Sequence, residues 1–245
     1  MAFAGAVFQN QKQVTDCPDI DLEAIGELAG DFTKSTAPVD EQQQILNGYR
    51  SEIENIDLAA AAKRLNAPIR DDAIVINCLG KDFKIDATGD MASECHKNAW
   101  VQVPVLNYIL YSKGLEPKGD WRSFGELSGA EDWSQFFSHS CELEMAKLAD
   151  AHTELFFELL HLFGAKEIPA ETNSDHSLVI FPLPLVPIVI NYWEADDSFD
   201  SKLNMLFDQT AEDNLNAEYI YTLCRGIIEM FRELLVKHSK DGKLF

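Results

Sequence analysis

The stretch SLVIFPLPLVPIVINYWEA, residues 177–195, decides the fold class. It is strongly apolar and carries prolines at 182, 184 and 187. Each proline pushes the preceding residue into extended geometry, so the stretch is not helical. We expect two short strands, near 178–181 and 186–193, with the prolines placing the joint between them at a bend or a sheet edge. The 13-residue apolar run within it, Leu178 to Ile190, is too short and too interrupted to cross a bilayer as a helix.

Helical and strand patterns occur on both sides of this stretch. Apolar residues at helical spacing predict helices at 22–32, 40–53, 57–66, 99–112, 142–163 and 218–237. Ala73–Asn77 and Phe83–Ala87 read as strands, and the turn residues between them predict a β-hairpin. The order predicts an α+β fold, in which an antiparallel sheet of β-hairpins packs against long amphipathic helices. We assign residues 1–68 to an N-terminal helical extension and 69–245 to the α+β domain.

Charge limits the partners of this chain. Among its 245 residues, 41 are acidic and 20 are basic, which gives a formal net charge of −21. Residues 131–245 alone carry 21 acids and 8 bases. Such a chain repels nucleic-acid phosphates and anionic membranes, so we expect neither as a partner. A basic protein, or a second copy in a homodimer, stays open as a partner.

The cysteines and the N-terminus favour a cytoplasmic protein. Five cysteines stand far apart, without a CxxC pair, at positions 17, 78, 95, 141 and 224. They read as core thiols in a reducing compartment rather than as a disulfide framework. The N-terminus MAFAGAVFQNQKQ lacks the basic segment of a signal peptide. The sequence also lacks GxGxxG, a P-loop, HExxH and GxSxG, so no standard cofactor or catalytic signature is present.

The loop Gly119–Leu127 is the first candidate site. Trp121 and Phe124 would stack on a flat ligand, and Arg122 would pair with its carboxylate or phosphate. The alternative is that both rings fill the core while Arg122 ties down the loop.

The ends of the predicted 177–195 hairpin form the second candidate site. Asp175 and His176 precede its first strand, and Trp193, Glu194, Asp196 and Asp197 follow its second strand. If the strands pair, these groups converge, and a histidine beside carboxylates suits a general base or an axial ligand. The alternative is a solvated strand end.

Three weaker candidates remain. Cys95-His96, with Cys78 and His139, would form a mixed metal site only if the fold brought them together. His161 would ligate a haem or corrinoid if it faced a hydrophobic cavity, whereas His152, nine residues earlier, would lie on the opposite helix face. The acids Asp196, Asp197 and Asp200 lack the spacing and the glycine of an EF-hand loop, so they offer at most weak calcium binding, with an acidic turn as the alternative. Ordinary core or surface roles are the alternative for all three.

Several short motifs match one family in order and spacing. They are Leu79-Gly80 followed by Asp86, the loop Gly119–Leu127, Leu183–Pro187, Tyr192-Trp193 followed by Asp197 and Phe199, and Leu206-Phe207-Asp208. From about residue 73 to 240 the chain therefore resembles the domain of unknown function numbered 3786. The resemblance implies a protein of anaerobic bacteria or archaea but no activity. Some members carry an iron–sulfur segment like that of corrinoid iron–sulfur proteins, which this chain lacks.

Three functions from different classes follow. The first is non-catalytic binding of a flat cofactor, a tetrapyrrole such as haem or a corrinoid, by Trp121, Arg122, Phe124, His161, His176, Trp193 and Asp197; the choice of tetrapyrrole rests on the resemblance. The second is an enzyme acting on a small molecule, in which His176 works with Glu194 or Asp197 as an acid–base pair. The third is an acidic module that docks a basic protein.

Overall fold

The computed structural model describes residues 39–93, 99–169, 173–196 and 198–241. The chain divides into two compact units, Met1–Gln44 and Ile45–Phe245, and both sheets belong to the second. The helix predicted at 22–32 lies outside the described residues. The α+β prediction is confirmed, but the strands form two antiparallel sheets rather than one.

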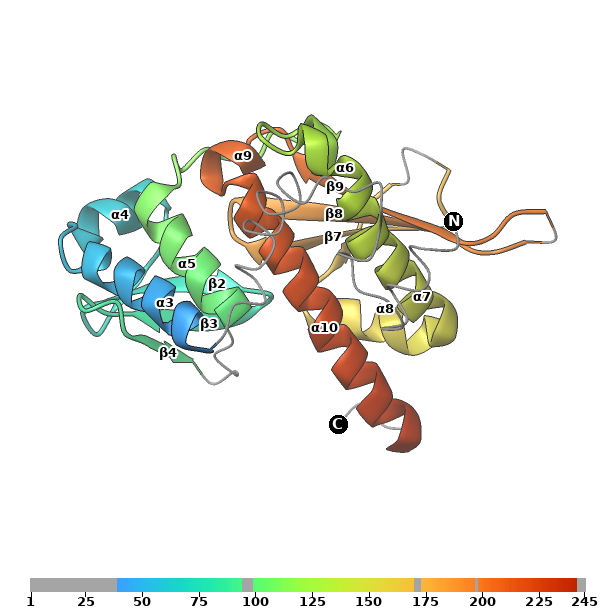
Figure 1. Ribbon diagram of the computed structural model, residues 1–245, viewed down its shortest axis with the longest axis horizontal. Helices are drawn as coiled ribbons and strands as arrows, with labels where there is room; N and C mark the ends of the chain where they lie inside the picture. Colours follow the sequence, from blue (N-terminus) through green and yellow to red (C-terminus); the bar gives the residue numbers. More distant parts are fainter. Residues whose placement is uncertain (1–38, 94–98, 170–172, 197, 242–245) are drawn as a thin grey trace, which may run out of the picture. The chain divides into compact units, whose positions relative to one another are not determined.

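Sheet A is a four-stranded meander in the order β1-β2-β3-β4 (Figure 1). Its strands are β1 (Ile69–Arg70), β2 (Ala73–Cys78), β3 (Lys81–Ile85) and β4 (Met91–Ser93). The predicted hairpin is β2 with β3. Its two turn residues, Leu79 and Gly80, have φ of 49° and 76°. Two successive positive φ values suit a type I′ turn, whose twist matches that of the paired strands.

Sheet B has five antiparallel strands in the order β5-β9-β8-β7-β6. They are β5 (Trp121–Ser123), β6 (Lys166–Glu167), β7 (His176–Leu183), β8 (Val186–Trp193) and β9 (Lys202–Asp208). The two strands predicted within 177–195 are β7 and β8. The prolines were predicted to place the joint at a bend or a sheet edge, and the bend is confirmed, because Pro184 lies in the turn between β7 and β8. The sheet-edge alternative does not apply, since β8 is the central strand. Pro187 is tolerated there because the β7 register shifts between Ile180 and Leu183 and pairing with β9 begins only at Ile188.

The helices differ from prediction mainly at one point. They are α3 (Val39–Ile53), α4 (Leu58–Arg64), α5 (Ala99–Tyr111), α6 (Ser134–Phe137), the π-helix η4 (Ser138–Glu142), α7 (Leu143–Ala151), α8 (Thr153–Leu162), α9 (Ala211–Asn214) and α10 (Ala217–Asp241). The single helix predicted at 142–163 is wrong, because His152, at φ −149° and ψ 52°, separates α7 from α8. None of the described helices is long and apolar enough to cross a membrane.

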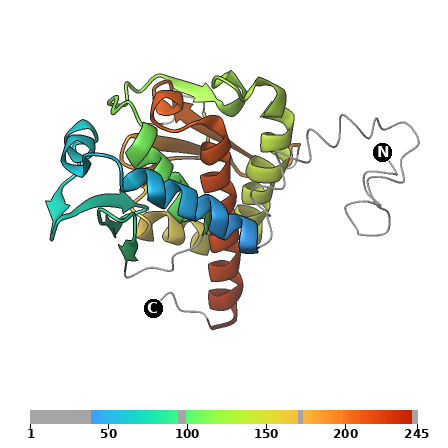
Figure 2. The same ribbon diagram turned by 60° about the vertical axis from the view of Figure 1, so that its left-hand side comes forward.

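The core lies between the sheets and the long helix α10. In Figure 1, α10 runs with α5 on one side and with α7 and α8 on the other, and both contacts are close. Figure 2 shows α3 beside α10, where the hydroxyls of Tyr49 and Tyr219 are 2.7 Å apart. The predicted boundary between residues 68 and 69 stays a prediction. Buried side chains of α3 and α4, such as Ile53 and Leu65, belong to the same core as those of sheet A.

Candidate functional site

The loop that carries Trp121, Arg122 and Phe124 is built into the core at one end of sheet B. Phe124 is only 2% exposed and stacks on Phe137 with ring centroids 4.1 Å apart. Arg122 donates from Nη2 to Asp120 Oδ2 at 3.0 Å, so it pairs within its own loop. Trp121 is half-buried in the edge strand β5. The core-filling alternative therefore describes Phe124, whose ring faces no open site.

A buried carboxylate, Asp208, fastens this loop to the sheet. Its Oδ2 accepts hydrogen bonds from the backbone N–H groups of Lys118 and Gly119, at 2.9 and 2.6 Å. Its Oδ1 accepts from the N–H and the hydroxyl of Thr210, at 2.9 and 2.8 Å. Burial alone would raise the pKa of the Asp208 carboxyl, but these hydrogen bonds outweigh burial and hold that pKa below its usual range. Asp208 is thus an ionised structural anchor.

A second polar side chain, Asn214, completes this fastening. Its amide donates to the carbonyls of Leu115 and Leu185 at 2.7 and 3.0 Å. Its Oδ1 accepts from the Ser112 hydroxyl and the Leu115 N–H at 2.9 and 3.0 Å. Every donor and acceptor of the Asn214 side chain is thereby used within the fold, so this end of sheet B holds the loops together.

The other end of sheet B brings His176 and Glu194 together, as the second candidate site required. His176 in β7 pairs with Tyr192 in β8, so the residues flanking this pair meet at the strand ends. His176 Nε2 lies 3.2 Å from Glu194 Oε1. The Glu194 N–H in turn donates to Asp175 Oδ2 at 2.8 Å, which fixes the backbone that carries the carboxylate. This arrangement holds a half-exposed imidazole against an exposed carboxylate.

Aromatic and acidic groups surround this pair. The ring of Phe157 from α8 stacks on the His176 ring, with centroids 4.1 Å apart and an interplanar angle of 27°. Tyr192 donates its hydroxyl to Asp150 Oδ1 at 2.7 Å, and Ser201 donates to Asp150 Oδ2 at 2.7 Å. Burial, and then the hydrogen bond to Asp150, raise the pKa of the Tyr192 hydroxyl, so it stays protonated. We define the His176 cluster as Asp150, Phe157, Asp175, His176, Tyr192 and Glu194.

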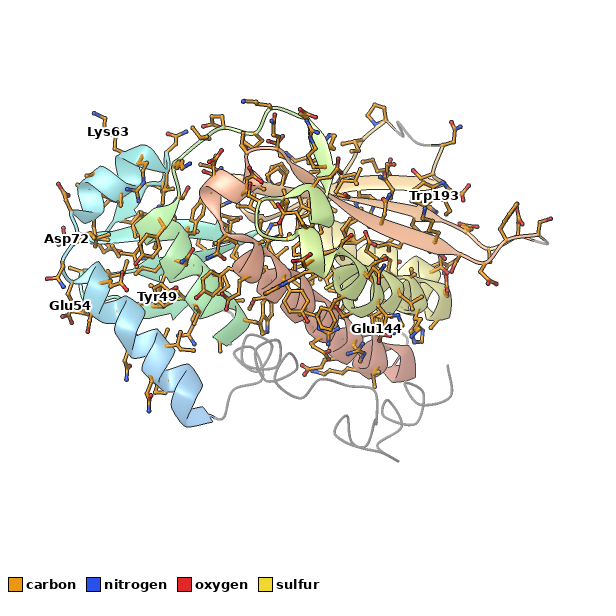
Figure 3. The ribbon with its side chains drawn as sticks, turned by 45° about the horizontal axis from the view of Figure 1, so that its top comes forward. Tyr49, Glu54, Lys63, Asp72, Glu144 and Trp193 are labelled. Atoms are coloured by element: carbon orange, nitrogen blue, oxygen red, sulfur yellow. The ribbon has the colours of Figure 1, made fainter. Side chains whose placement is uncertain are left out.

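Of the residues predicted for this site, Trp193 points away from His176 and Asp197 is not among the described residues. Trp193 adjoins Tyr192 in β8 and so points to the opposite face of the strand, where Lys202 Nζ lies 5.4 Å from its ring centroid (Figure 3). Asp197 lies outside the described residues. Asp196 accepts from the N–H groups of Ser198 and Phe199, which makes it a turn-forming residue.

The two candidate sites stand at opposite ends of sheet B. Trp121 pairs with Asp208, whereas His176 is joined through Tyr192 to Leu203, five residues earlier in β9. Five residues correspond to about 17 Å along the strand, and the three strand spacings from β5 to β7 add about 14 Å across the sheet. The described residues predicted to bind one flat cofactor are therefore divided between these two ends and do not form a single site.

The weaker candidates do not assemble in the described part of the chain. His161 is exposed, and its Nε2 lies 3.9 Å from Glu167 Oε1, so the surface alternative describes it and the hydrophobic cavity that cofactor ligation would require does not surround it. Cys78 is buried in β2, His139 is exposed in η4, and Asp200 is exposed, while Cys95 and His96 lie outside the described residues. Among the residues that are described, no group of three or more His, Cys, Asp or Glu side chains is arranged to hold a metal ion.

Sequence reasoning missed Phe157 and Asp150 as members of the His176 cluster. They come from α8 and α7, on either side of the break at His152, and neither stands in a recognisable motif. Only the packing of these helices on sheet B brings Phe157 and Asp150 to the end of the β7–β8 hairpin. Phe157 and His161 are four residues apart in α8 and share a face, which places His161 at the margin of the cluster.

One comparison with known proteins gives a result. The family model described as a domain of unknown function (DUF3786) matches residues 57–230, more than half of the chain. The protein belongs to this family. The match begins at Asp57, whose side chain caps α4, and ends within α10, so it spans both sheets. No curated protein and no solved structure matches the chain.

Proposed function

We propose that this DUF3786 protein binds a small polar molecule at the His176 cluster and that His176 exchanges a proton with it. The contact of 3.2 Å between His176 Nε2 and Glu194 Oε1 carries this proposal. When Nε2 donates to the carboxylate, Nδ1 keeps the lone pair that accepts a proton. A base whose ring is oriented by a third group is the usual arrangement of acid–base catalysis.

The surroundings of His176 indicate the class of ligand. Three carboxylates, those of Asp150, Asp175 and Glu194, lie in the cluster and disfavour an anion. They favour an amine or a molecule rich in hydroxyl donors. The Phe157 ring, stacked on the imidazole, adds an apolar wall beside the polar groups. We therefore expect a small amine- or hydroxyl-bearing ligand.

Binding of haem or a corrinoid stays a prediction with less geometric support. The residues predicted for it are divided between the two ends of sheet B, and Phe124 is buried. His176 Nε2, the usual ligating atom, already contacts Glu194. Adding haemin or cobalamin to the purified protein tests this function directly, since binding to a histidine shifts the Soret or corrin absorption band.

A fragment screen tests the proposed site. ¹H–¹⁵N spectra of the full chain are recorded with a library of small amines and polyols. We expect hits whose shifts centre on His176, Phe157 and Tyr192, and we expect His176→Ala to weaken them at least tenfold. His139→Ala is the matched control, because His139 is an exposed imidazole in η4, eleven residues and about 16 Å along the helices from Asp150. Hits that centre on residues 119–127, or that survive His176→Ala, would exclude the site.

A further inference from the structure

The loop between β8 and β9, described at residues 194–196 and 198–201, presents the large apolar side chain of Phe199 to solvent. Phe199 is 75% exposed, more than any other large hydrophobic residue in the described part of the chain. Figure 1 shows the two strands running on past the helices that cover sheet B, and Figure 3 shows the loop continuing beyond Trp193. A phenylalanine so exposed contributes little hydrophobic stabilisation to the fold and is open to a partner.

Hydrogen bonds to Asp196 hold the main chain at Ser198 and Phe199. Asp196 Oδ1 accepts from the N–H groups of Ser198 and Phe199 at 2.7 and 2.8 Å. The carbonyl of Phe199 accepts from the Asp196 N–H at 3.0 Å. A partner would therefore meet an aromatic ring whose main chain needs no further ordering, and this lowers the entropy cost of association. Preorganised aromatic anchors are the residues that dominate protein interfaces.

The charge around this ring specifies its partner. Between Trp193 and Lys202 the sequence has four acids, Glu194, Asp196, Asp197 and Asp200, against the single Lys202. Lys202 lies over the Trp193 ring rather than at the tip. An exposed aromatic ring flanked in sequence by acidic residues is complementary to an apolar pocket edged by Lys or Arg. A second copy of this chain, at net −21, and an anionic membrane surface would both be repelled.

We propose that the β8–β9 loop, described at residues 194–196 and 198–201, is a docking finger that inserts Phe199 into an apolar pocket, rimmed by basic residues, of another protein. This interaction is separate from ligand binding at the His176 cluster, because the Phe199 side chain is 75% exposed and its described hydrogen bonds run to Asp196, outside the cluster.

Photo-crosslinking followed by titration tests the docking finger. The full chain with p-benzoylphenylalanine in place of Phe199 is irradiated in an extract of its native cells, and the same residue in place of Leu162 serves as the control. Leu162 is an exposed apolar side chain on α8. The protein captured only through position 199 is identified, purified and titrated against the wild type, Phe199→Ser, Asp200→Asn and Leu162→Ser.

The expected result is a basic partner whose affinity falls about tenfold or more with Phe199→Ser. Affinity should also fall with Asp200→Asn and with rising salt, and it should be unchanged by Leu162→Ser. The proposal would be overturned if position 199 captured only a second copy of the chain or captured nothing. It would also be overturned if Phe199→Ser left the affinity for the partner unchanged. Binding of fragments at the His176 cluster should be unaffected by Phe199→Ser, so failure of one proposal is distinguishable from failure of the other.

Discussion

At the scale of single residues, three positions of the motifs that carry the family resemblance, Gly80, Asp86 and Asp208, serve the fold. Asp208 fixes the loop before β5, and Gly80 supplies a positive φ in the β2–β3 turn. Asp86 accepts from the N–H groups of Thr88 and Asp90 to close the turn between β3 and β4. Because each of these side chains or glycines satisfies local backbone geometry, resemblance in these motifs indicates a shared fold before it indicates a shared reaction.

Replacing Asp208 tests this reading. Asp208→Asn puts an amide N–H₂ against backbone donors, so we expect the free energy of unfolding to fall by about 3 kcal/mol at pH 7. Asp120→Asn is the control: it makes the same change in an exposed carboxylate of the same loop, and the loss should stay below about 1 kcal/mol. Denaturant unfolding measures both, and equal losses would contradict the structural role of Asp208.

The difference in unfolding free energy between the wild type and Asp208→Asn should also depend on pH. The folded pKa of Asp208 lies below that of an unfolded aspartate, about 3.9. Its ionised form therefore stabilises the fold fully above that value, and this stabilisation is lost as the pH falls through the lower, folded pKa. The difference in stability between wild type and Asp208→Asn should shrink as the pH is lowered from 6 toward 3. A constant difference would show that ionisation of Asp208 does not contribute.

Buried thiols give a second prediction at this scale. Burial raises the pKa of Cys141 to about 12, and Cys78 and Cys224 are buried as well. Since the thiolate is the reactive form, iodoacetamide at pH 8 should leave these three residues unmodified in the native protein. They should all react once guanidinium unfolds the chain. Peptide mass spectrometry decides the matter, and rapid native alkylation of Cys141 would contradict its placement.

At the scale of elements, α10 joins the two halves of the core through a close helix contact. A Cβ built on Gly226 would lie 2.0 Å from Cδ2 of Trp100 in α5. On the same helix, the adjacent Arg225 donates to the Ser140 carbonyl of η4 at 2.5 Å, and Arg232, further along, pairs with Glu144 of α7 at 2.9 Å. Polar contacts on one side and a glycine on the other thus set the position of α10.

Gly226→Ala tests this contact, and Gly48→Ala serves as a control in which the free energy of unfolding should change in the opposite direction. Gly226→Ala should lower the free energy of unfolding by about 1–3 kcal/mol, because overpacking against Trp100 outweighs the better helix propensity of alanine. Gly48→Ala, in α3, has nothing within 4 Å of the added Cβ, so it should raise stability by up to about 1 kcal/mol. Thermal or denaturant unfolding measures both. A neutral or stabilising Gly226→Ala would show that α5 and α10 do not approach so closely.

Element types were more predictable than their connections. Amphipathic spacing located α10, and apolar alternation with turn residues located the β2–β3 hairpin, because both patterns lie within a short stretch of sequence. Strand β9 was missed, because its central position depends on pairing with β8 and β5 rather than on its own pattern. The break at His152 was missed for the same reason: the residues around it have helical spacing, and tertiary packing decides where α7 ends and α8 begins.

At the scale of the whole α+β unit, sheet B separates structural from candidate functional groups. The Asp208 end binds loops through satisfied hydrogen bonds, and the His176 end carries a half-exposed imidazole beside carboxylates. Part of the candidate site was predictable, because two paired strands must bring His176 and Glu194 to one end. The contributions of Phe157 and Asp150 were not, since they depend on how α7 and α8 pack on the sheet.

The most direct test compares ligand binding and unfolding for His176→Ala and Asp208→Asn, using a fragment that binds the wild type. The account predicts that His176→Ala keeps the unfolding free energy within about 1 kcal/mol of the wild type and loses the fragment. It predicts that Asp208→Asn is less stable yet binds the fragment with unchanged affinity while folded. If folded Asp208→Asn loses the fragment, or His176→Ala retains it, the assignment of function to the His176 end of sheet B is contradicted.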